Sequence, residues 1–85
     1  MELNEQFELA FAKSKNLKER PSNEILLQLY SLYKQGSEGD APATMEYAIF
    51  DFVGKAKHEA WLKYSGTTKE NAMKQYVELV EQLSQ

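Results

Sequence analysis

The stretch Tyr30-Ser31-Leu32-Tyr33-Lys34-Gln35 decides the fold, because it ends a segment in which apolar residues recur with helical spacing. Tyr30, Tyr33 and Lys34 stand at i, i+3 and i+4, so two aromatic rings and one cation share one face of the predicted helix. The apolar face of this helix comprises Ile25, Leu26, Leu29, Tyr30, Leu32 and Tyr33. That face is wider than one neighbouring helix can cover, so we expect it to touch the core and a second surface.

Three further segments have the helical period, one before this helix and two after it. The first begins near Leu3, the third begins at Asp51 and ends near Gly66, and the fourth reaches the end of the chain. Their apolar positions are Leu3, Phe7, Ala10 and Phe11, then Phe52, Val53, Ala56, Ala60, Trp61 and Tyr64, then Ala72, Met73, Tyr76, Val77, Val80 and Leu83. The helix starts are marked by Pro21 with Ser22 or Asn23 as a cap, and by Thr67 and Glu70 at capping-box spacing.

A long irregular link separates the second and third predicted helices. Residues 36–44 are predicted as a loop because they are rich in turn formers, namely Gly36, Gly39, Asp40 and Pro42. Residues 45–50 have no clean period and are predicted as an irregular crossover with a short turn of helix. Since no segment alternates as a strand would, the fold class is all-α, a four-helix bundle with a long crossover between helices 2 and 3.

Length, charge and cysteine content narrow the class of protein. The 85 residues suit one small domain spanning 1–85. Ten basic and thirteen acidic side chains give a net charge of −3, which argues against broad adhesion to nucleic acid or anionic membranes. Without cysteine, a basic leader or a long apolar run, the chain is expected to be soluble, cytoplasmic and not stably inserted in a membrane.

The residues of a catalytic site are not evident in this sequence. The single histidine, His58, lies between Lys57 and Glu59 and is typical of a surface or edge position. A site with two histidine ligands or with thiolate ligands is excluded within one chain, and no glycine-rich phosphate loop is present. We therefore expect no enzymatic activity, no metal and no cofactor.

Recognition of a ligand is the chemistry that remains. Four cations, Lys13, Lys15, Lys18 and Arg20, fall within eight residues, although such a run is also typical of a solvated helix end. Taken singly, the tyrosines suit core packing, the lysines suit solvent, and Trp61 and Met73 suit the core. Only the arrangement, with Lys34 and Lys57 on different helices, favours a clamp around a compact polyanion.

Several segments occur in an order and spacing that match a known family. They are Leu17-Lys18 before Pro21, Leu29 to Gln35 with Gly39-Asp40, Asp51-Phe52 with Gly54 to Lys57 and Ala60-Trp61, and Gly66 to Met73 with Tyr76. On these residues the chain resembles the acyl-CoA-binding protein family, which is diazepam-binding-inhibitor-like, along essentially its whole length.

The resemblance implies an up-down-down-up helix topology and a fatty acyl-CoA ligand. In the family, the positions of Tyr30, Lys34 and Lys57 hold the 3′-phosphate of the CoA head. The positions of Lys15, Tyr33 and Tyr76 surround or contact the adenine nucleotide. The acyl chain lies in a groove between helices 2 and 3, which here corresponds to Leu26, Leu27, Leu29 and Ala56.

Departures from the family pattern concern the crossover and the third helix. Members of the family usually carry a Pro-Gly pair in the crossover, whereas residues 45–50 here contain none and are one residue longer. His58 stands where the family commonly has tryptophan, and Val53 stands at a family lysine position. We expect these changes to alter the shape of the groove and to keep the head-group site intact.

The leading hypothesis is a monomeric, non-catalytic intracellular carrier that binds medium- to long-chain fatty acyl-CoA thioesters and forms a pool of them. The alternative is a helical protein-interaction module that uses the tyrosine-rich face of the second helix. An acyl-CoA hydrolase or isomerase is less favoured, because such enzymes place this kind of domain beside a catalytic domain that the chain lacks.

Overall fold

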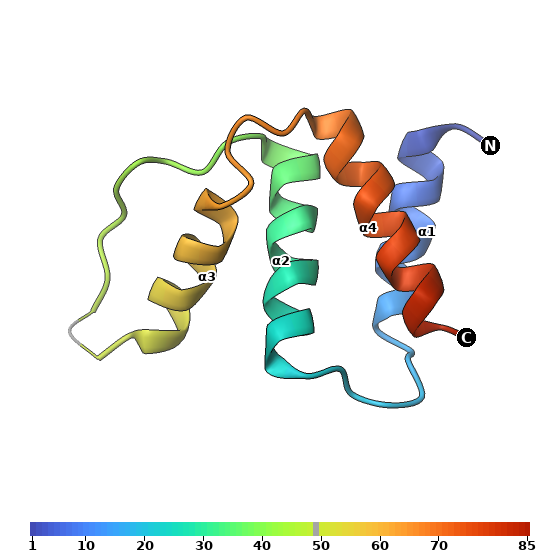
Figure 1. Ribbon diagram of the computed structural model, residues 1–85, viewed down its shortest axis with the longest axis horizontal. Coiled ribbons are helices and arrows are strands. Elements are labelled where there is room, and N and C mark those ends of the chain that lie inside the picture. The colour runs from blue at the N-terminus through green and yellow to red at the C-terminus, as the bar shows by residue number, and fades with distance from the viewer. Residues whose placement is uncertain (49) are drawn as a thin grey trace.

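The computed structural model describes residues 1–48 and 50–85, and in them four helices and no strand are found. The helices are α1 (Leu3–Ser14), α2 (Asn23–Glu38), α3 (Phe52–Leu62) and α4 (Lys69–Leu83). In Figure 1, α2 and α3 run in the same direction and α1 and α4 run against them, because the long link after α2 returns the chain to the other end. The predicted all-α bundle with a crossover between helices 2 and 3 is confirmed.

The helices stand in the spatial order α3, α2, α4, α1 (Figure 1). α4 packs between α2 and α1, and α3 packs against the far side of α2. Among the described residues, the buried core cluster draws on α1, α2 and α4 and comprises Phe7, Ala10, Leu29, Leu32, Ala72, Tyr76 and Val80. The wide apolar face of α2 therefore meets the core on one side and α3 on the other, as its sequence predicts.

Side chains cap three of the helix starts. The Ser22 Oγ accepts a hydrogen bond of 3.2 Å from the N–H of Ile25 at the start of α2. At the start of α4, the Thr68 Oγ1 accepts a bond of 3.1 Å from the N–H of Asn71. The cap is thus Thr68, one residue after the predicted Thr67, although the helix begins where its sequence predicts. At α3, the Asp51 Oδ1 accepts from Gly54.

Gly36 lies inside α2, so the prediction that residues 36–38 belong to a loop was wrong. A Cβ at Gly36 would lie 3.1 Å from the Cζ of Phe7 and 3.2 Å from the Cγ of Met73. The glycine is there because α2 approaches these side chains closely, and not because the chain turns. The helix ends two residues later, where Gly39 has a φ of 89°.

In the crossover, residues 45–48 are irregular, as predicted. A turn follows them, in which the N–H of Asp51 donates to the carbonyl oxygen of Ala48 at 3.0 Å, and Ile49 lies outside the described residues. Instead of forming a helix of its own, the crossover is tied to the helices on either side through the polar groups described next.

Two polar side chains join the end of α2 to the turn between α3 and α4. Gln35 is fully buried, and its Nε2 donates to the Oδ1 of Asp40 and to the carbonyl oxygen of Thr67, both at 2.8 Å. The same Asp40 oxygen accepts from the N–H of Gly66 at 2.9 Å. These bonds lower the pKa of Asp40, the Gly66 bond contributing most. The Asp40 carboxylate therefore holds the two segments together.

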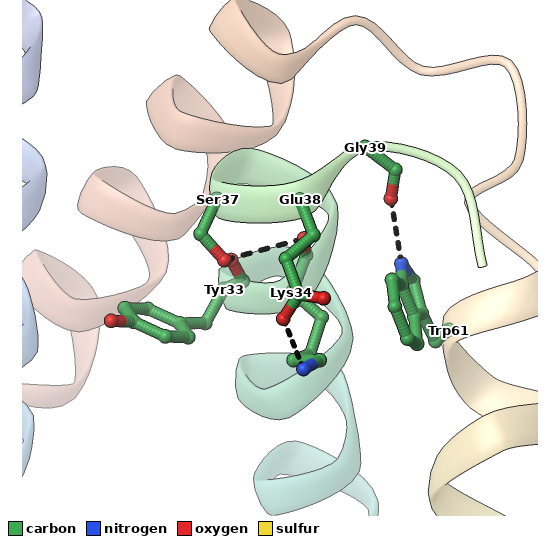
Figure 2. Close-up of polar contacts among 6 residues, drawn as sticks. All are labelled: Tyr33, Lys34, Ser37, Glu38, Gly39 and Trp61. Carbon is green, nitrogen blue, oxygen red and sulfur yellow. Dashed lines mark hydrogen bonds and ion pairs between the residues drawn. The ribbon is translucent and has the colours of Figure 1, made fainter.

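His58 and Trp61 fasten the crossover to α3. The Trp61 Nε1 donates to the carbonyl oxygen of Gly39 at 2.9 Å (Figure 2). The His58 Nε2 donates to the carbonyl oxygen of Pro42 at 2.7 Å, and its Nδ1 accepts from the Tyr47 hydroxyl. The prediction of a surface or edge position for His58 was wrong: only 5% of the residue is exposed, because the crossover folds back over α3.

Replacing Asp40 by alanine should lower the stability to urea at neutral pH and should also change its dependence on pH. The folded-state pKa of Asp40 lies below its unfolded value, so its stabilisation is present above the unfolded pKa of about 3.9 and is lost as the pH falls through the folded pKa. The urea midpoints of the parent and of Asp40→Ala should therefore converge in acid. Glu59→Ala, on the exposed surface of α3, is the control. A constant difference between parent and Asp40→Ala from pH 7 to pH 2 would contradict this account.

Candidate functional site

A groove of about 440 Å³ lies between α2 and α3. Three of the four predicted groove residues, Leu26, Leu27 and Ala56, line it. Its other lining residues are Arg20, Asn23, Tyr30, Phe52, Val53 and Lys57. Phe52 and Val53 are 71% and 66% exposed, so apolar surface at the groove remains open to solvent. Such a surface on a small protein is typical of a binding site.

Leu29 is the fourth predicted groove residue, and the α2–α3 groove does not include it. It is 8% exposed and belongs to the core cluster. Leu27 and Leu29 are two positions apart, which is about 200° around a helix, so they cannot both face α3. Leu29 instead lines an adjoining hollow of about 220 Å³ on the other side of α2, to which Tyr33 and Tyr76 also contribute.

The three residues predicted to hold a phosphate lie close together. Tyr30 lines the groove, and the Nζ of Lys57 lies 5.2 Å from the centroid of its ring. Lys34, one turn further along α2, forms an ion pair with Glu38 and has its Nζ 5.0 Å from the centroid of the Trp61 ring (Figure 2). Lys57 of α3 thus contacts Tyr30 directly, while Lys34 lies one turn further along α2 and contacts Glu38 and Trp61.

The other three predicted head-group residues form a second set on the far side of Tyr30. The ring centroid of Tyr33 lies 4.5 Å from that of Phe11 and 5.8 Å from that of Tyr76. The Nζ of Lys15 lies 4.4 Å from the centroid of the Phe11 ring, so Lys15 borders the same aromatic group. Because Tyr30 lines both the groove and the adjoining hollow, it connects the two sets.

Tyr76 is largely a core residue, because only 2% of it is exposed. Its hydroxyl donates to the Oγ of Ser14 at 3.2 Å. Burial raises the pKa of Tyr76, and the Ser14 bond opposes part of that rise. Its hydroxyl is therefore neutral at physiological pH and forms part of the floor of the hollow.

The charged form of Lys34 is stabilised by its neighbour Glu38. The hydrogen bond from Lys34 to Glu38 raises the pKa of the lysine, while partial burial works in the opposite direction. Its ammonium group is thus charged at neutral pH and can bind an anion.

Among residues 1–48 and 50–85 there is no group of acidic or histidine side chains that could hold a metal ion, and no helix long and apolar enough to cross a membrane.

Sequence reasoning missed several residues of this site. Phe52 was assigned only to the apolar stripe of the third helix, and Arg20 only to a basic run, yet both line the groove. Val53 was expected to alter the shape of the groove but was not named among the residues that line it. The spacing of Val53, Ala56 and Lys57 at i, i+3 and i+4 is the signal that could have placed them on one face of α3. The i, i+4 spacing of Lys34 and Glu38 could likewise have predicted their ion pair.

The fold and the site together define a small helical module with an apolar groove, bordered at Tyr30 by two lysines. The family model described as acyl-CoA-binding protein matches residues 4–80. An acyl-CoA-binding protein homolog from Manduca sexta is 47% identical over 98% of this chain and 92% of its own length. The crystal structure of Oryza sativa acyl-CoA-binding protein 2 is similar, with a TM-score of 0.86 and 40% identity, over 96% of this chain and 90% of that one.

A longer relative contains a similar segment. Enoyl-CoA delta isomerase 2 from Rattus norvegicus is 49% identical over 92% of this chain, but the match covers only 20% of that protein. On the family model and on relatives that match over nearly their full length, the chain belongs to the acyl-CoA-binding protein family.

Proposed function

We propose that the protein binds fatty acyl-CoA thioesters of medium to long chain and acts as their intracellular carrier. The observation that carries this proposal is the continuity of the apolar groove with the paired cations, because Tyr30 and Lys57 belong to both. An acyl-CoA molecule has the same division into an apolar chain and a polyanionic head. Family membership supports the same ligand.

The acyl chain would lie in the groove between α2 and α3. Leu26, Leu27, Phe52, Val53 and Ala56 offer it an apolar surface that solvent reaches in the free protein. Burying a 16-carbon chain at about 0.8 kcal/mol per methylene contributes up to roughly 12 kcal/mol before the costs of binding. The chain can therefore set most of the affinity.

The head group would be recognised by the two sets of residues around Tyr30. Tyr30, Lys34 and Lys57 would hold the 3′-phosphate, and Lys15, Tyr33 and Tyr76 would border the adenine nucleotide. Their separation on the two sides of Tyr30 supports this assignment. Charge-assisted contacts of this kind contribute about 1.5–3 kcal/mol each and would fix the orientation of the ligand.

A carrier needs no bond chemistry, and we propose a non-catalytic, monomeric, cytoplasmic protein formed by one domain over residues 1–85, without a cofactor. The use of both ring nitrogens of His58 in bonds to the crossover supports this, since neither is free to act as a base. The alternative of a protein-interaction module is not favoured, because the family model and relatives that match over nearly their full length are acyl-CoA-binding proteins.

Calorimetric titration with palmitoyl-CoA, free CoA and palmitate at matched salt tests the proposal. We expect one-to-one binding of the thioester that is much tighter than binding of either fragment, because the groove and the cations act on one molecule. Failure to bind acyl-CoA of any length from 8 to 20 carbons would overturn the carrier function and favour the interaction module.

Lys34→Ala should weaken palmitoyl-CoA binding by about 10- to 100-fold, since it removes one charge-assisted phosphate contact. Tyr30→Phe should weaken it less, because it removes a neutral hydroxyl only. Lys74→Ala is the control, because Lys74 pairs with Glu70 on α4 and lies outside the groove and the adjoining hollow. Titrations in which Lys34→Ala and Tyr30→Phe bind as tightly as the parent would show that the assignment of the phosphate site is wrong.

Ala56→Phe should discriminate between acyl chains of different length. The added ring would occupy part of the 440 Å³ groove, so palmitoyl-CoA should bind at least about 10-fold more weakly while acetyl-CoA changes little. Ala12→Phe makes the same substitution on the exposed surface of α1 and is the control. Equal weakening for both thioesters would mean that the acyl chain does not lie in this groove.

A further inference from the structure

Lys34 faces an acidic side chain of its own helix. It pairs with Glu38 across one helical turn, while the Trp61 ring lies on its other side (Figure 2). The Lys34 side chain is only 25% exposed, whereas that of Glu38 is 53% exposed. The partly buried cation is thus held in place, and its counter-ion is the more accessible partner.

The position of Glu38 is unfavourable for the helix. It is the last residue of α2, where the negative end of the helix dipole disfavours an acid, and the last turn contains no basic residue. A lysine four residues before a glutamate is also the weaker orientation of such a pair. Stabilisation of α2 is therefore a poor explanation for this carboxylate.

Glu38 is the carboxylate that pairs with one of the two proposed phosphate-binding cations, Lys34. The Asp40 carboxylate accepts hydrogen bonds from the Gln35 side chain and from the N–H of Gly66. Lys57 forms no ion pair with any residue that the structure describes, and its ammonium lies over the Tyr30 ring. One of the two proposed phosphate-binding lysines is thus free of a carboxylate, and the other is occupied.

We propose that Glu38 is a built-in competitor of the ligand phosphate for Lys34, and that it limits both the affinity for the phosphorylated nucleotide and the preference for it over the dephosphorylated form. This inference rests on the proposed function, because it requires that Lys34 meets the phosphate. Binding the phosphate requires the Lys34–Glu38 pair to open, or the two anions to share one cation at close range. Either event reduces the gain from the phosphate contact.

Glu38→Gln tests the competition, because it keeps the shape of the side chain and removes its charge. We expect the variant to bind palmitoyl-CoA about three- to ten-fold more tightly than the parent in calorimetry at low salt, with a smaller difference at high salt. Binding of 3′-dephospho-palmitoyl-CoA should not change. Glu70→Gln removes an acid from the equivalent pair with Lys74 on α4 and should have no effect.

A double-mutant cycle locates the effect at Lys34. In a Lys34→Ala background, Glu38→Gln should no longer tighten binding. The inference is overturned if Glu38→Gln weakens binding, which would make Glu38 a positioning residue for Lys34, or leaves it unchanged. It is also overturned if both ligands gain equally, or if the gain persists without Lys34. A parent protein that does not bind palmitoyl-CoA at all would instead overturn the proposed function.

Discussion

The site depends on how α3 is attached to α2. In the part of the chain that the structure describes, the core cluster contains residues of α1, α2 and α4 and none of α3, so α3 lies outside the main core. Near the end of α2, hydrogen bonds add to the packing of the two helices: Gln35 and Asp40 bond to the turn after α3, and the buried Trp61 bonds to Gly39. Because hydrogen bonds are directional, they fix the position of α3 without requiring that its whole length pack against α2. The groove is what remains between the two helices.

This arrangement separates stability from binding. The residues that hold the core, such as Phe7 and Val80, lie away from the groove, and those that line it, such as Phe52 and Val53, remain exposed. Leu26 and Tyr30 border both the groove and the hollow over α1 and α4. A ligand that contacts Tyr30 therefore meets both parts of the molecule. The proposed division of acyl-CoA between an apolar groove and a polar head site follows from this geometry.

The four helices and the long link between α2 and α3 could be predicted from the sequence, because the helical period and turn-forming residues mark them, and the up-down-down-up topology followed from the family resemblance. The errors have physical causes. Glycine is typical of turns, so Gly36 was assigned to the loop, but the close packing of α2 against Phe7 and Met73 explains why a glycine occupies this position. His58 reads as a surface residue because the groups that bury it, at Pro42 and Tyr47, come from a link without periodicity. Leu29 was placed in the groove because the assignment was carried over from the family without considering the helix geometry. Leu29 lies about 200° around α2 from Leu27 and belongs to the core cluster.

The attachment of α3 also bears on how the molecule moves. A segment that lies outside the main core and keeps apolar residues such as Phe52 and Val53 exposed opens at a lower free energy than the core does. Hydrogen exchange would therefore divide the chain into a slowly exchanging unit of α1, α2 and α4 and a faster unit formed by the described part of the crossover with α3. Since α3 is one wall of the groove, the groove could widen by local unfolding while the remaining three helices stay folded. A bulky chain would then enter sideways through a transient opening, and need not thread in from one end.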